Sequence, residues 1–186
     1  MNPKEVYFLP GRRSKLTGTI GQIISDLGYK IYGREVLGEF EVYPIQKQIE
    51  IIANDIKSNF WDKEAKIIGR SYGGYLIMHT IIELLPDIFP GKILLLGPVL
   101  GKSHFRKGYC SRPPRAYKLL KYAKEKKLDP FNIEIYTGKE DIGCDYKLAE
   151  EIFKDAKNSK LHILENITHY FPHELNYQII KSFLES

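Results

Sequence analysis

Short apolar runs alternate along the chain with longer stretches in which apolar residues recur every three or four positions. A short apolar run is typical of a buried strand, whereas the wider spacing is typical of an amphipathic helix. Strands are predicted at 6–9, 30–37, 65–68, 92–96, 133–136 and 161–164. Strands that alternate with helices usually build a parallel sheet covered by helices. The pattern therefore predicts an α/β fold, a three-layer α/β/α sandwich around a six-stranded, mostly parallel sheet.

The helices are predicted between these strands, and the one at 72–85 is apolar on nearly all sides, which is typical of a helix buried in the middle of a domain. Other helices are expected at 20–27, 45–60 and 148–156 and from Pro172 onward. The stretch 97–114 is expected to be only a short loop. No repeat, low-complexity tract or linker interrupts the pattern, and a single domain over residues 1–186 is the simplest expectation.

The strongest chemical signal is Gly69-Arg70-Ser71-Tyr72-Gly73, which lies between a predicted strand and the predicted buried helix. A serine on such a tight strand-to-helix turn is held at positive φ, so its neighbours two before and two after must be small. The amides at the start of the helix point at the serine and favour a developing negative charge. The motif predicts Ser71 as a nucleophile, and the alternative is an ordinary glycine-rich turn.

A serine nucleophile needs a base, and histidine is the usual one. His169 is favoured, because it lies in a turn after the last predicted strand, where an imidazole can reach the serine. His173 is the second choice. It is less favoured than His169 because it would already belong to the final helix. The other histidines are less suited: His79 lies within the buried helix, His162 within the last strand and His104 in a basic segment.

The acid that orients the histidine should follow the fifth predicted strand, and Asp141 is the favoured candidate. Glu140 and Asp145 remain alternatives, although Asp145 also suits the N-cap of the next helix. Cys144 is the rival nucleophile, but it has no base of its own at a sensible chain position and is interpreted as a bystander.

Two backbone amides are expected to form an oxyanion hole. One belongs to Tyr72, directly after the nucleophile, and the other is expected from Arg12 in the loop after the first strand. Gly11 would let that loop turn closely. The predicted substrate-binding residues are Gly11 and Arg70. The alternative is that Pro10-Gly11 is only a turn.

These motifs, in the order serine, acid, histidine, resemble those of the α/β-hydrolase superfamily. The resemblance extends from about residue 5 to the end of the sequence, and Ser71 to Tyr75 is also similar to the elbow of prolyl-oligopeptidase-like peptidases. It implies a serine hydrolase that cleaves a small ester or thioester through Ser71, His169 and Asp141, with water as the only co-substrate and no cofactor. An amidase or peptidase, or a non-catalytic binding protein on the same fold, are the alternatives.

Composition narrows the class of partner. The chain of 186 residues is 43% hydrophobic and 27% charged, which suits a globular protein. The net charge of +5 is uneven, because ten of the basic residues and one acid lie in 102–127. A solvated helix face and loop is the simplest interpretation, and an anionic ester-type substrate is a further expectation. No nucleic-acid motif accompanies the charge, so no nucleic-acid partner is expected.

The remaining signals concern location and metals. Two cysteines, Cys110 and Cys144, are interpreted as reduced thiols. No signal peptide is evident, and the apolar runs are too short for a membrane span of roughly 20 residues. The histidines and cysteines lack metal-ligand spacing. A cytoplasmic protein without a metal is expected, and the sequence carries no signal of oligomeric state.

Overall fold

The computed structural model describes residues 4–186, with gaps at 86, 102, 107, 108, 112, 114 and 116, and it describes only the backbone of 103–106 and 109–111. Its main feature is a sheet of six strands in the order β2-β1-β3-β4-β7-β8, in which every pairing is parallel. The strands are β1 (Glu5–Leu9), β2 (Lys30–Gly33), β3 (Lys66–Arg70), β4 (Lys92–Leu96), β7 (Asn132–Gly138) and β8 (Ser159–Leu164). The predicted parallel sheet is confirmed.

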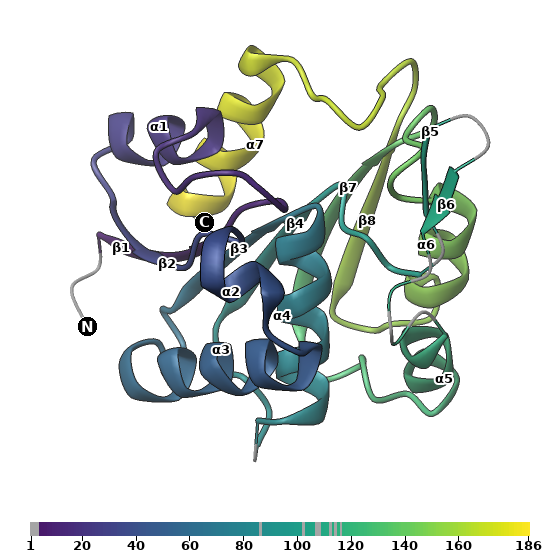
Figure 1. Ribbon diagram of the computed structural model, residues 1–186, viewed down its shortest axis with the longest axis horizontal. Coiled ribbons are helices and arrows are strands. Elements are labelled where there is room, and N and C mark those ends of the chain that lie inside the picture. The colour runs from purple at the N-terminus through teal and green to yellow at the C-terminus, as the bar shows by residue number, and fades with distance from the viewer. Residues whose placement is uncertain are drawn as a thin grey trace.

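Helices cover both faces of this sheet (Figure 1). One face carries α1 (Thr19–Asp26) and α7 (His173–Glu185), which pack against each other. The other face carries α3 (Ile45–Asn59), α4 (Tyr72–Glu83), α5 (Lys118–Lys124) and α6 (Tyr146–Phe153). The short α2 (Gly38–Val42) precedes α3. The three layers of the predicted α/β/α sandwich are therefore present.

Two apolar clusters form because successive side chains of a strand point to opposite faces. In β1, Val6 and Phe8 pack with α1 and α7, whereas Tyr7 and Leu9 pack with α3 and α4. Since both faces are covered, the central strands are apolar at consecutive positions, as parallel strands usually are. This is why short unbroken apolar runs mark the strands in the sequence.

The strand order places a crevice at the carboxyl ends of β1 and β3. The chain leaves β1 towards α1 on one face of the sheet, and it leaves β3 towards α4 on the opposite face. Where neighbouring connections diverge in this way, a crevice opens beyond the strand ends, and ligands of open α/β sheets usually bind there. The Ser71 turn and the Gly11 loop flank this crevice.

The structure differs from the predicted elements in the unpredicted helix α2, in the stretch 97–114 and at the end of β2. The stretch expected to be only a loop contains an antiparallel pair, β5 (Ser103–Arg106) and β6 (Tyr109–Ser111), so that expectation was wrong. Strand β2 ends at Gly33 rather than at 37. Gly33 has φ +149°, and a Cβ there would lie 1.8 Å from the carbonyl oxygen of Phe8, so the chain turns away at this glycine. Among the helices of the described residues, none combines the length and apolar character needed to cross a membrane.

Candidate active site

The turn between β3 and α4 holds Ser71 in a strained backbone conformation, with φ 52° and ψ −118°. Glycine is required on both sides of it. A Cβ on Gly69 would lie 2.8 Å from the Cα of Gly74, and a Cβ on Gly73 would lie 2.1 Å from the carbonyl oxygen of Leu9. The positive φ and the tight contacts agree with the turn expected from the sequence, and they leave the serine side chain at the carboxyl end of the sheet.

Three side chains from three different loops converge at this end of the sheet. Ser71 Oγ lies 3.0 Å from His169 Nε2, and His169 Nδ1 lies 2.8 Å from Asp141 Oδ1 and 3.0 Å from Oδ2. The side chain of Asp141 is fully buried and that of His169 is 15% exposed. The structure therefore brings together the three residues predicted as nucleophile, base and acid, in a geometry that can move a proton away from the serine hydroxyl.

Asp141 is held by the chain that follows it. The amides of Gly143 and Cys144 both donate to Asp141 Oδ1, at 2.7 and 2.9 Å. Two backbone donors satisfy the buried carboxylate and fix its orientation towards the imidazole. A Cβ on Gly143 would lie 2.8 Å from His169 Nδ1, so this glycine also makes room for the ring. Gly143 was not predicted from the sequence, where its only signal was its place two residues after the acid.

The alternative acids and bases have other roles or positions. Asp145 caps α6 and accepts a hydrogen bond from the amide of Lys147 at 3.0 Å. Glu140 is exposed, and His173 is exposed at the first residue of α7. Cys144 is buried beside Asp141, and burial raises the pKa of its thiol to about 12. Such a thiol is almost entirely protonated at neutral pH and is a poor nucleophile.

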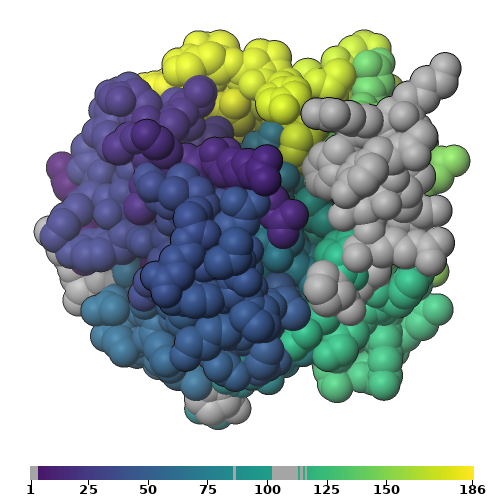
Figure 2. Space-filling view, viewed as in Figure 1, coloured from purple at the N-terminus to yellow at the C-terminus, as the bar shows by residue number. Residues whose placement is uncertain are grey.

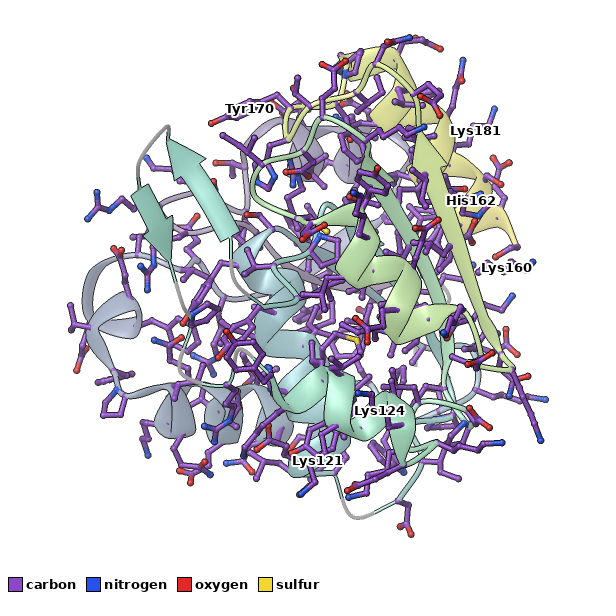
Figure 3. All side chains as sticks on the ribbon, turned by 90° about the vertical axis from the view of Figure 1, so that its right-hand side faces the viewer. Lys121, Lys124, Lys160, His162, Tyr170 and Lys181 are labelled. Carbon is purple, nitrogen blue, oxygen red and sulfur yellow. The ribbon has the colours of Figure 1, made fainter. Side chains whose placement is uncertain are left out.

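His79 and His162 contact groups other than Ser71. His79 is buried in α4, with Nδ1 2.6 Å from Glu83 Oε1. His162 stacks on Tyr136, with the ring centroids 4.2 Å apart, and lies on β8 at the edge of the sheet (Figure 3). The side chain of His104 lies outside the described residues. His79 and His162 thus lie within a helix and the last strand of the sheet, as the sequence predicted.

The two residues predicted to supply oxyanion amides, Arg12 and Tyr72, both lie at the site. The Tyr72 amide belongs to the first turn of α4, whose N–H groups have no acceptor within the helix. The loop after β1 approaches closely, because a Cβ on Gly11 would lie 3.3 Å from Ser71 Cβ. Within the described part of the chain, no hydrogen bond uses the Arg12 amide. Both amides are thus available, and their role as oxyanion donors stays a prediction.

A cavity of about 1330 Å³ opens above these groups. Its walls come from the loop between β1 and α1, the start of α3, and the segment from His169 to Phe171. In Figure 2 the chain that follows β1 (purple) lies between the C-terminal part (yellow) and the α2–α3 region (blue). Tyr170, 85% exposed, projects outward beside the histidine (Figure 3). The predicted residues Gly11, Arg12, Arg70 and Tyr72 all line the cavity.

The wall between β1 and α1 is positively charged. Arg12 and Arg13 are 54% and 82% exposed, and their Nε atoms lie 3.5 and 3.3 Å from the same oxygen of Glu41. The guanidinium of Arg12 also lies 4.7 Å from the ring centroid of Tyr72. One carboxylate thus neutralises only half of the charge of the two arginines, and Lys15 adds a further cation to the lining.

Arg70 lines the cavity, and its predicted role in substrate binding stays a prediction. Its guanidinium donates to backbone carbonyls of the protein, including that of Leu96 at 3.0 Å and that of His169. Part of the positive charge of the basic segment is neutralised within the described residues, because Lys118 pairs with Glu83 and Lys121 pairs with Glu125. The side chains of 102–112 lie outside the described residues. The part of the chain that the structure describes contains no cluster of three metal-ligating side chains.

No family model and no curated protein matches this sequence. Solved structures do match its fold. A CIB-like hydrolase from Thermoplasma acidophilum is 16% identical at a TM-score of 0.66, over 99% of this chain and 86% of the other. A monoacylglycerol lipase from Paleococcus ferrophilus is 13% identical at 0.66, over 97% and 94%. Mouse alpha/beta hydrolase domain-containing protein 10 is 11% identical at 0.68, over 97% and 88%. The parallel sheet, the strained serine turn and these likenesses together show that the chain has the fold of the α/β-hydrolase superfamily.

Proposed function

We propose that this protein is a serine hydrolase that cleaves a small ester or thioester through an acyl-enzyme on Ser71. The observation that carries the proposal is the hydrogen-bonded chain from Ser71 Oγ through His169 to the buried Asp141, at 3.0 and 2.8 Å, at the floor of a cavity. The names of the similar structures, hydrolase and lipase, support hydrolysis as the class of reaction.

The reaction would proceed in two steps. His169 Nε2 takes the proton of Ser71 as Oγ attacks the acyl carbon, and Asp141 stabilises the imidazolium that forms. The proton then passes to the departing alcohol or thiol, which leaves the acyl group on Ser71. In the second step His169 takes a proton from water, the hydroxide attacks the acyl group, and Ser71 recovers its proton.

The amides of Arg12 and Tyr72 are proposed to bind the oxyanion of both tetrahedral intermediates. The positive end of the α4 dipole would also stabilise the oxyanion, because the helix begins directly after the nucleophile. Loss of one such donor typically lowers the rate by about 100- to 1000-fold. The cavity is larger than the roughly 300–1,000 Å³ of a typical ligand pocket, so it has room for both the acyl and the leaving group.

A negatively charged substrate is also proposed. Arg12 and Arg13 share one oxygen of Glu41 at the cavity wall, and a second carboxylate or phosphate there would complete their neutralisation. Hydrolysis of two esters of equal size, one neutral and one carrying a carboxylate, tests this at low salt. A faster rate for the carboxylated ester is expected, and equal rates would contradict the charge preference while leaving the hydrolase proposal intact.

Labelling by a serine-reactive phosphonate tests the hydrolase proposal itself. Wild-type protein should be labelled on Ser71, and it should hydrolyse aryl esters or thioesters in a panel that also contains amides. Ser71→Ala should lose labelling and lower kcat by roughly 10⁶-fold. Ser14→Ala is the matched control, because Ser14 lines the same cavity and should label normally. Labelling retained in Ser71→Ala, or no labelling and no turnover in the wild type, would overturn the proposal.

A further inference from the structure

Arg70 links the ends of three elements around the site. It is the last residue of β3, directly before Ser71. Its Nη1 donates to the carbonyl of Leu96, at the end of β4, at 3.0 Å, and lies 3.5 Å from the carbonyl of Gly97. Its Nη2 donates to the carbonyl of His169, in the loop after β8. One side chain thus fastens the histidine loop to the two central strands.

The residues around Arg70 leave room for its guanidinium and contact it on two sides. Gly97 has φ +49°, and a Cβ there would lie 2.8 Å from Arg70 Nη1 and 2.9 Å from Asp141 Oδ2. On the opposite side the guanidinium lies 5.4 Å from the ring centroid of the buried Phe171. The carbonyl of Phe171 in turn accepts a hydrogen bond from Asn176 Nδ2 at 3.1 Å. The segment 169–171 is therefore held by Arg70 and by the first turns of α7.

The positive charge of Arg70 lies close to both Asp141 and His169. Burial lowers the pKa of the guanidinium, and the carboxylate of Asp141 opposes that shift. Arg70 Nη1 lies 3.5 Å from His169 Nε2, on the side where the ring meets Ser71. Arginine suits this position better than lysine, because a planar fork of donors can bind several carbonyls at once.

We infer that Arg70 is the positioning residue of this site, which holds the His169 loop against the ends of β3 and β4 so that Nε2 stays within reach of Ser71 Oγ. This inference rests on the proposed function for its kinetic consequence, although the geometric consequence does not depend on it. A displacement of about 1 Å in a catalytic group can cost on the order of 100-fold in rate. The effect should fall on the reaction step rather than on substrate affinity.

The test compares Arg70→Met, Arg70→Lys and Arg34→Met. Arg34 is the matched control, because its Nη2 donates to Asp55 at 2.7 Å and it does not line the cavity. We expect the rate of phosphonate labelling and kcat to fall about 100-fold in Arg70→Met, with KM changed less than threefold. Arg70→Lys should recover part of the loss, since it keeps the charge and one donor. Arg34→Met should lower the melting temperature without changing the labelling rate.

A second readout does not require activity. The proton between His169 Nδ1 and Asp141 should give a low-field NMR signal in the wild type, and this signal should broaden or vanish in folded Arg70→Lys. Unchanged labelling, kcat and imidazole signal in folded Arg70 variants would overturn the inference. If Arg70→Met does not fold, the comparison of Arg70→Lys with wild type decides in the same way. Absence of labelling in the wild type with a signal that still depends on Arg70 would defeat the proposed function alone.

Discussion

The two sides of the cavity are built in different ways. On one side, Ser71, His169 and Asp141 form a closed set of hydrogen bonds, and the carboxylate is fixed by two amides. On the other side, Arg12 and Arg13 are more than half exposed and share one carboxylate oxygen. We therefore expect the first side to tolerate few substitutions, and the second to tolerate changes of its exposed side chains.

Under the proposed function, the reaction step and the choice of substrate would depend on different sides of the cavity. A reacting centre gains from groups held at fixed distances, because misplacement lowers the rate steeply. Exposed charges attract a substrate over a longer range, and each contributes little by itself. Substitutions on the hydrogen-bonded side should therefore have large effects on rate or folding, and those on the arginine side small effects on substrate preference.

After Ser71→Ala, the largest effect on kcat is expected for Asp141→Asn. The amide would no longer hold the imidazole in the tautomer that accepts the serine proton, and a loss of about 10⁴-fold in kcat is expected. Asp145→Asn is the control four residues later, because Asp145 only caps α6 and asparagine caps equally well. Steady-state hydrolysis of an aryl ester measures both variants. A loss below tenfold in Asp141→Asn would remove the contrast between the two sides of the cavity.

The next largest effect is expected on the free energy of unfolding, when one glycine from each side of the cavity is replaced by alanine. In Gly73→Ala the new Cβ would lie 2.1 Å from the carbonyl oxygen of Leu9, so the backbone of β1 must shift, and a loss of about 3 kcal/mol in the free energy of unfolding is expected. In Gly11→Ala the nearest atom is Ser71 Cβ at 3.3 Å, which needs only a small adjustment and should cost less than about 1 kcal/mol. Urea unfolding measures both. Equal losses would show that the β1–α1 loop is as tightly built as the turn at Ser71.

Much of the hydrogen-bonded side could be predicted from the sequence, because its residues follow local patterns. Ser71 lies in a glycine pattern between a strand and a helix, and Asp141 and His169 each follow a short apolar run. The hairpin formed by β5 and β6 could not be predicted in this way, since its strands are short and polar. The end of β2 depends on contact between Gly33 and a neighbouring strand, which no local pattern contains.

The contacts of Arg70 were equally out of reach of the sequence. Its partners are backbone carbonyls 26 and 99 residues away, and every residue type carries a carbonyl. The pattern of the turn leaves this position open, so a cation there was interpreted as facing the substrate. Only the fold shows which groups surround the guanidinium, and this is the general reason why positioning residues are harder to predict than reacting ones.

A smaller effect is expected for Arg13→Gln on the arginine side. An exposed ion pair contributes about 0.2–1 kcal/mol, so hydrolysis of the carboxylated ester should slow by at most about fivefold at low salt, with the neutral ester unchanged. The difference should shrink as salt rises, because the Debye length falls to about 8 Å at physiological ionic strength. An equal decrease for both esters would show that Arg13 supports the loop rather than the substrate.

The smallest effect is expected for alkylation of Cys144. This experiment tests whether solvent reaches the buried residues on the hydrogen-bonded side. In a Cys110→Ser background it is the remaining cysteine, and its thiol is buried with a pKa raised to about 12 by burial. A thiolate fraction of about 10⁻⁴ at pH 8 and the absence of solvent contact should prevent alkylation by iodoacetamide in the folded protein, with activity unchanged. Unfolding in guanidinium chloride should allow complete alkylation, which is the positive control. Rapid alkylation of the folded protein, followed by mass spectrometry, would mean that the loop carrying Asp141 opens readily, and the two sides of the cavity would then differ in charge but not in rigidity.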